Sequence, residues 1–98
     1  MMKQCNSLEE VRKEVDNIDE ELVKLIAKRT HYIRQAAAFK ESVEEVKTGD
    51  RIDFILSRVR HRAIDLGVSP NMISELFEIM INEMVETEIA ELKNRNKF

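Results

Sequence analysis

Apolar residues recur every three or four positions through residues 8–43, and no glycine or proline interrupts them. They are Leu8, Val11, Val15, Ile18, Leu22, Leu25, Tyr32, Ala36, Phe39 and Val43. This alternation is the heptad signal of a helix that faces another helix. Ser7 and Glu10 stand at the spacing that caps the first turn of such a helix. We therefore predict one helix over residues 8–43, about 54 Å long at a rise of about 1.5 Å per residue, followed by a loop to residue 50.

Two shorter helices are predicted in the rest of the chain. The second covers residues 50–66 and ends before Gly67, whose missing Cβ suits a left-handed helix end. Pro70, preceded by a capping serine, then opens a third helix over residues 70–93. The tail from Lys93 to Phe98 is expected to fray. With two Gly and one Pro in the whole chain, turn-rich folds are excluded, and the predicted class is all-α with three helices.

The composition limits the partners of this chain. Sixteen Lys and Arg against nineteen Asp and Glu give a net charge of −3, which does not favour nucleic acid. No apolar run reaches the roughly 18 residues that span a bilayer, and the N-terminus lacks a signal-like stretch. The one cysteine, Cys5, has no internal disulfide partner, as is typical of a reducing compartment. We expect a cytoplasmic protein with a single domain over residues 1–98 and no nucleic-acid or membrane partner.

The long first helix implies a partner. A compact domain of 98 residues is about 30 Å across, so a helix of about 54 Å would extend beyond it with its apolar side in water. A second copy of the chain is the simplest cover, because two-fold dimers are the commonest assemblies. The alternative is a helix broken near Arg29, which would give a four-helix monomer.

Three ionisable residues occupy apolar positions. Arg29 falls on the apolar side of the first helix, and Lys40 lies within about 20° of the same side and about 16 Å further along, so the two could bracket a small anion. Glu88 falls in the apolar stripe of the third helix, where an acid must find a partner or bind a proton. The pattern leaves open whether these residues form a ligand site or an ion cluster that only sets helix register. No spacing predicts a metal site or a phosphate-binding loop.

The surroundings of these residues resemble the all-helical chorismate mutase family. The likeness is carried by Arg12, Arg29 and Lys40 at their spacing on one predicted helix and by five short segments. These are VRKEVDNID (11–19), LIAKR (25–29), FK (39–40), DR (50–51) and LF (76–77). The resemblance implies an intertwined antiparallel homodimer with three helices per chain and two identical sites, each built from both chains.

The resemblance also implies an activity and a role for each site residue. The activity is a Claisen rearrangement of chorismate to prephenate without cofactor or metal. The partner's Arg12 and Arg29 would hold the substrate carboxylates, which the guanidinium fork matches, and Arg51 would also bind substrate. Lys40 would donate to the ether oxygen as its C–O bond breaks.

The predicted helix length agrees with a shared site. Arg12 and Lys40 of one chain would lie about 42 Å apart on the helix, too far to touch one small molecule. If two first helices pair antiparallel about a two-fold axis near Leu22, the partner's Arg12 falls opposite residue 32, between Arg29 and Lys40.

Two residues depart from the family pattern. Glu88 stands where bacterial mutases are expected to carry Gln, and it can donate a hydrogen bond only when protonated, so we expect a rate that rises toward acid pH. Nearby cations would lower its pKa and apolar surroundings would raise it. Ile52 stands where many mutases carry a carboxylate. With the Cys5–Leu8 segment, it looks more like the isochorismate-pyruvate lyase branch, which forms salicylate and pyruvate. Mutase is the favoured reading, lyase the alternative, and a noncatalytic helical dimer or regulatory module the third.

Overall fold

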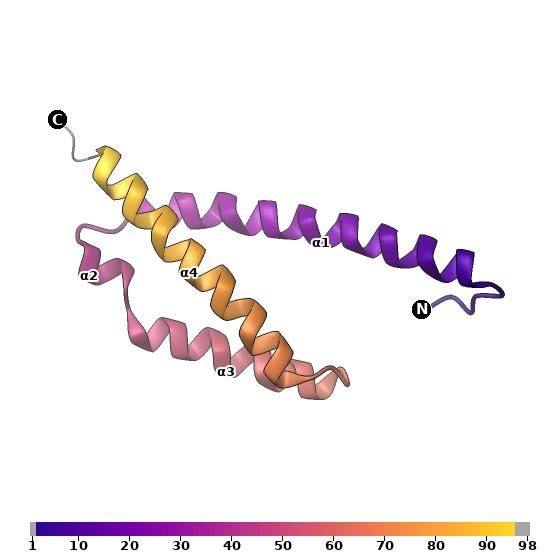
Figure 1. Cartoon of the computed structure of the whole chain (residues 1–98). Helices are drawn as coiled ribbons and strands as arrows, with labels where there is room; N and C mark the ends of the chain where they lie inside the picture. The colour runs from indigo at the N-terminus through magenta and orange to yellow at the C-terminus, as the bar shows by residue number, and fades with distance from the viewer. Residues whose placement is uncertain (1, 96–98) are drawn as a thin grey trace. The chain divides into compact units, whose positions relative to one another are not determined.

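The structure, a computed structural model, describes residues 2–95 and is helical throughout its regular elements (Figure 1). The helices are α1 (Leu8–Ala37), α2 (Val43–Val46), α3 (Gly49–Asp65) and α4 (Pro70–Arg95). No strand occurs within residues 2–95, so the all-α prediction is confirmed. The chain divides into two compact units, which within the described range cover residues 2–32 and 33–95.

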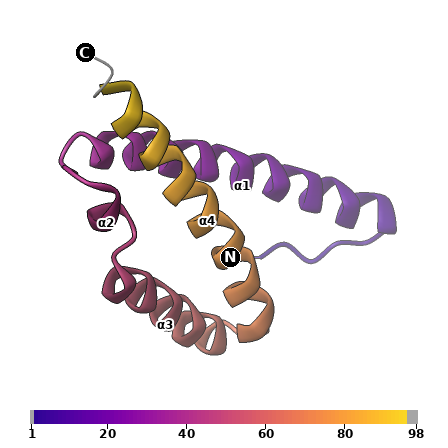
Figure 2. The ribbon, with the colours of Figure 1, turned by 60° about the vertical axis from the view of Figure 1, so that its left-hand side comes forward.

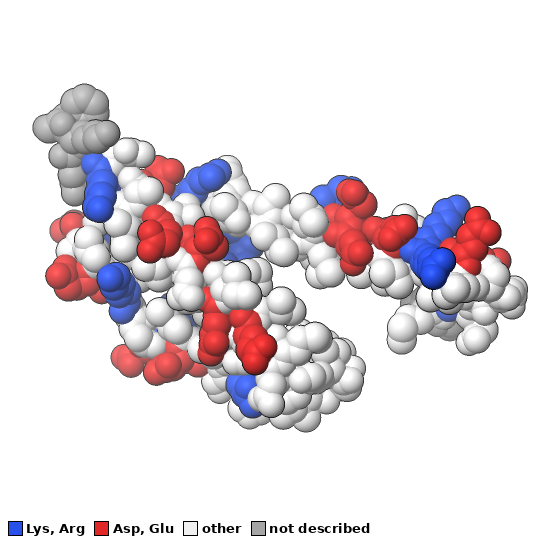
Figure 3. Space-filling model, viewed as in Figure 1, with Lys and Arg blue, Asp and Glu red and all other residues white. Residues whose placement is uncertain are grey.

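The first unit is dominated by α1. The Ser7 hydroxyl accepts a hydrogen bond from the Glu10 amide at 3.1 Å, as the capping pattern predicts. The Glu10 carboxylate accepts from the amide of Asn6 at 2.9 Å, one residue before the Ser7 amide that a capping box would use. No described residue of this unit is buried. Figure 3 shows Lys and Arg interspersed with Asp and Glu along α1, with uncharged side chains between them.

The second unit has its own apolar core. Ile55 of α3 packs with Ile81 and Met84 of α4, and all three are buried. Six half-buried apolar residues surround them, namely Ile33, Ile52, Leu56, Val59, Phe77 and Val85. The helices α3 and α4 pack together, α2 contacts α4, and α4 runs back from the end of α3 toward the last turn of α1 (Figure 2). The core therefore joins α3 to α4.

The turn between α3 and α4 forms as the sequence predicts. Gly67 has a φ of +75°, a conformation that glycine adopts without steric cost. The Ser69 hydroxyl then accepts from the Met72 amide at 3.2 Å, which satisfies one unpaired donor at the start of α4. Local residue chemistry is enough to place this turn.

The predicted end of the first helix is wrong. α1 ends at Ala37 rather than at residue 43, and the expected loop contains the short helix α2, whose Val46 is buried. The amides of Ala38, Phe39 and Lys40 each donate to the carbonyl three residues earlier, so the last turn tightens and stops. Ser42 then starts α2 by accepting from the Glu45 amide at 3.3 Å.

The third predicted helix is slightly longer than expected. α4 continues to Arg95, so Lys93 and Arg95 are helical rather than frayed, and residues 96–98 of the predicted tail lie outside the described residues. Within residues 2–95, no helix combines the length and the apolarity needed to cross a membrane.

Candidate active site

Two of the predicted site residues lie on α1 in the first unit. Arg12 is exposed and Arg29 is half-buried. Their positions on this continuous helix place their backbones about 26 Å apart along its axis. One small molecule therefore cannot touch both arginines of a single chain.

Arg51 lies in the first turn of α3 and is exposed. Its guanidinium carbon is 5.4 Å from the centre of the Phe54 ring, and Arg58 approaches the same ring at 5.6 Å. Both distances allow cation–π attraction. In this chain Arg51 is thus held against an aromatic side chain of its own helix.

Lys40 lies in the segment between α1 and α2 and is half-buried. Its Nζ donates to the carbonyl oxygen of Glu45 at 3.3 Å. The Glu45 carboxylate in turn accepts from the Glu41 amide at 2.8 Å. The α2 turn therefore holds the Lys40 segment through both a side chain and a backbone group.

Glu88 is buried in α4, with 3% of its surface exposed. It shares the inward face of the helix with Ile81, Met84 and Leu92, which are also buried. Burial raises the pKa of the Glu88 carboxyl, and the positive charge of Lys40 opposes that rise without cancelling it. The sequence left open whether burial or nearby cations would dominate the pKa of Glu88, and in the structure the effect of burial is the larger.

The second unit therefore brings together two of the predicted residues, Lys40 and Glu88. An ammonium group is a donor at neutral pH, and a carboxyl group with a raised pKa keeps its proton to a higher pH than an ordinary one. Two such donors suit an oxygen atom that gains negative charge during a reaction.

Ile52 has a structural role that the sequence did not reveal. It is half-buried and packs against the cluster of Ile55, Ile81 and Met84. An apolar residue at this position therefore contributes to the core of the second unit, and its identity need not report on the substrate.

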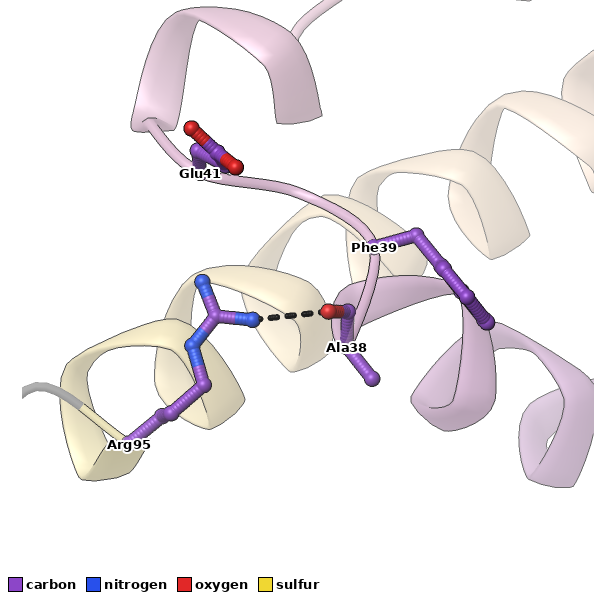
Figure 4. Close-up of a pocket in the computed structure, with 4 residues that line it drawn as sticks. All are labelled: Ala38, Phe39, Glu41 and Arg95. Carbon is purple, nitrogen blue, oxygen red and sulfur yellow. Dashed lines mark hydrogen bonds between the residues drawn. The ribbon is translucent and has the colours of Figure 1, made fainter.

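Arg95 was overlooked in the sequence because it stood in the tail expected to fray. Its guanidinium donates to the carbonyl oxygens of Ala37 at 3.3 Å and Ala38 at 2.9 Å, and also to that of Lys40. Figure 4 shows this side chain reaching from α4 to Ala38, with Phe39 pointing away from it. An open pocket of about 490 Å³ lies here, lined by Ala38, Phe39, Glu41 and Arg95. No local pattern marks a partner so distant in the chain.

The helices and the Lys40–Glu88 pair define an all-α protein with a polar donor site built into its second unit. The chain belongs to the chorismate mutase type II family, whose profile matches residues 11–89. The resemblance seen in the sequence is thereby confirmed.

Individual relatives fall on both branches named above. The chorismate mutase of Methanocaldococcus jannaschii is 30% identical over 94 residues, covering 92% of this chain and 95% of that protein. The bifunctional chorismate mutase/prephenate dehydratase of Buchnera aphidicola subsp. Acyrthosiphon pisum is 31% identical over 97 residues, and the chain spans 25% of its length. The isochorismate pyruvate lyase of Pseudomonas aeruginosa is 25% identical over 85 residues, covering 87% of this chain and 84% of that enzyme.

Proposed function

We propose that this protein is a chorismate mutase that converts chorismate to prephenate without a cofactor. The observation that carries the proposal is the buried Glu88 carboxyl with its raised pKa, placed where the charge of Lys40 acts on it. The family and the relative from Methanocaldococcus jannaschii support this choice of reaction.

The chemistry suits such a pair of donors. In the rearrangement the ether C–O bond breaks while a C–C bond forms in the same molecule, and no proton or electron is gained or lost. The protein therefore needs only to hold the reactive conformation and to stabilise charge on the ether oxygen. In the proposed mechanism the Lys40 ammonium and the protonated Glu88 carboxyl both donate to that oxygen.

The proposal includes a homodimer. The substrate carries two carboxylates, and Arg29, Arg51 and the partner's Arg12 are the proposed cations for them. The separation of about 26 Å between Arg12 and Arg29 on one helix favours a site that takes one arginine from each chain. The exposed apolar side of α1 favours the same arrangement, because a second α1 could cover it.

Isochorismate-pyruvate lyase is the second candidate. The enzyme from Pseudomonas aeruginosa matches most of this chain, and elimination of pyruvate from isochorismate breaks a similar ether bond. The apolar Ile52, which in the sequence looked more like the lyase branch, is explained by its packing against the core. The mutase therefore remains the preferred activity.

A product assay separates these functions. The purified full chain is incubated with chorismate and, separately, with isochorismate, and prephenate and salicylate are quantified between pH 5 and pH 8. We expect prephenate from chorismate. Salicylate from isochorismate without prephenate formation would instead support the lyase. Loss of neither substrate would leave a noncatalytic dimer or regulatory module.

A further inference from the structure

Arg95 closes the end of α1 from a distant part of the chain. The last carbonyl groups of a helix have no partner within it. Arg95 donates to the carbonyl of Ala37, the last residue of α1, which also accepts from the Lys40 amide. It donates as well to the carbonyls of Ala38 and Lys40, just beyond the helix end. A positive charge at a helix C-terminus is also favoured by the helix dipole. This single side chain therefore holds the backbone that leads from α1 to Lys40.

The same face of α4 carries Arg95 and Glu88. The two residues are two helical turns apart, about 10.5 Å along the axis. Leu92 lies between them on that face and is buried with 4% of its surface exposed. One turn of α4 thus carries the buried Glu88, and a turn further along carries Arg95, which hydrogen-bonds to the Lys40 carbonyl.

We infer that Arg95 is a positioning residue, which sets the Lys40 ammonium group against Glu88 by fixing the backbone of residues 37–40. The inference rests on the proposed function of the Lys40–Glu88 pair. Without Arg95, the carbonyls of Ala38 and Lys40 would turn to water, and that of Ala37 would keep only the Lys40 amide. No glycine is present near residue 37 to end α1 in another defined way.

The planar guanidinium is what allows one residue to do this. Arginine presents five N–H donors in a rigid fork, so it can serve several carbonyls at once. Lysine carries the same charge on a single nitrogen and could not reach all three carbonyls in this geometry. An Arg95→Lys variant therefore keeps the positive charge but cannot make all three hydrogen bonds to the carbonyls.

The first test is steady-state kinetics on chorismate with the full chain. We expect Arg95→Ala to lower kcat by about 10- to 100-fold, the range that a displaced catalytic group produces, with KM changed by less than about twofold because the carboxylate ligands are untouched. Arg95→Lys should fall between this variant and the parent. Lys93→Ala removes an exposed charge from the same helix turn and should leave kcat unchanged.

A double-mutant cycle distinguishes positioning from a general loss of structure. If Arg95 acts through Lys40, then Arg95→Ala should cost nothing further in a Lys40→Ala background. An equal loss in both backgrounds would overturn the inference. So would an Arg95→Ala variant with the kcat of the parent.

Hydrogen exchange tests the contact without relying on activity. In Arg95→Lys and Arg95→Ala, peptides that cover residues 37–42 should exchange faster, while peptides within α3 keep their protection. Unchanged exchange at residues 37–42 would overturn the inference even if activity fell. No turnover of chorismate by the parent chain would overturn the proposed function, and the exchange result would still decide whether Arg95 holds this segment.

Discussion

The two units differ in how they treat their apolar side chains. In the second unit, Ile55 and Ile81 are each 3% exposed, and they form a core between α3 and α4. In the first unit, Ile18 is 58% and Leu25 is 59% exposed, although both belong to the same regular apolar stripe. The second unit buries its own stripe, and the first presents its stripe to solvent.

This difference indicates that the two units have different roles. An isolated helix gains little stability from its own hydrogen bonds and depends on the burial of one face. In the proposed homodimer the exposed face of α1 is the assembly surface, whereas the second unit holds the Lys40–Glu88 pair. We expect substitutions in the first unit to affect assembly and substitutions in the second unit to affect catalysis.

The largest effect is expected from Lys40→Ala in the second unit. Removal of a donor to the developing oxyanion should raise the barrier by about 3–4 kcal/mol, which lowers kcat by about 10²- to 10³-fold. The oligomeric state should stay the same, because Lys40 lies in the second unit, beyond the end of α1. Kinetics and light scattering on the same samples check both statements.

Lys47→Ala is the matched control for this variant, since Lys47 is an exposed lysine of the same connecting region. It should retain full activity. Activity that survives in Lys40→Ala would remove this lysine from the mechanism.

In the first unit, Leu22→Glu should break assembly rather than chemistry. Leu22 lies in the middle of the apolar stripe and is 51% exposed in the single chain. If a second α1 covers it, the substitution removes about 1.5–3 kcal/mol of burial per chain and places a charge in the interface. Sedimentation at micromolar concentration should show a shift from dimer to monomer, with loss of activity following it.

Ala27→Glu adds the same charge on the opposite side of α1, where Ala27 is exposed, and should leave the dimer intact. Equal sedimentation of Leu22→Glu and the parent would show that the α1 stripe does not hold two chains together.

The elements that were predicted well have local causes. The turn at Gly67 and Ser69 depends on neighbouring residues, so the sequence reveals it. The end of α1 does not, because besides the amides of residues 38–40 it depends on Arg95, far along the chain, which donates to the carbonyls of Ala37 and Ala38. No glycine or proline marks that end, and the apolar period continues through Phe39 and Val43. A helix that ends through a distant contact cannot be delimited from a local pattern.

The candidate site divides in the same way. The position of Glu88 in an apolar stripe predicts that it is buried, and it is. The direction of its pKa shift could not be predicted, because desolvation and the charge of Lys40 act in opposite directions and their balance depends on distance and depth. The roles of Arg12, Arg29 and Arg51 stay predictions that rest on the resemblance and on a second chain.

An intermediate effect is expected from pH. Because burial raises the pKa of Glu88 above its ordinary value of 4.5, the protonated donor persists to a higher pH and is lost as pH rises through the folded pKa. The kcat should be constant below that pKa and fall up to about tenfold per pH unit above it. Glu88→Gln keeps a donor at every pH, so its profile should be flat.

The free energy of unfolding should also fall as pH rises through the pKa of Glu88. A raised folded pKa stabilises the fold below the ordinary pKa, and this contribution is lost as pH rises through the folded pKa. Glu88→Gln should therefore be more stable than the parent at pH 8 and show no such advantage at pH 4, as measured by urea unfolding. A parent profile identical to that of Glu88→Gln would exclude Glu88 as the second donor.

The smallest effect is expected from the two glycines, both in the second unit. Replacing each by alanine should change the stability of that unit in opposite directions. A Cβ at either Gly67 or Gly49 would meet no atom within 4 Å, so packing cannot distinguish them. Gly67→Ala forces a φ of +75° on a residue with a side chain, at a cost of about 1 kcal/mol. Gly49→Ala replaces glycine at the first residue of α3 and should stabilise the helix by up to about 0.5–1 kcal/mol. Thermal unfolding followed by helical circular dichroism should show midpoints displaced in opposite directions.

The same measurement tests whether α1 unfolds together with the second unit. If α1 folds with the second unit through the dimer, each variant should shift one common transition. A separate early transition that neither variant moves would show that α1 unfolds independently of this core.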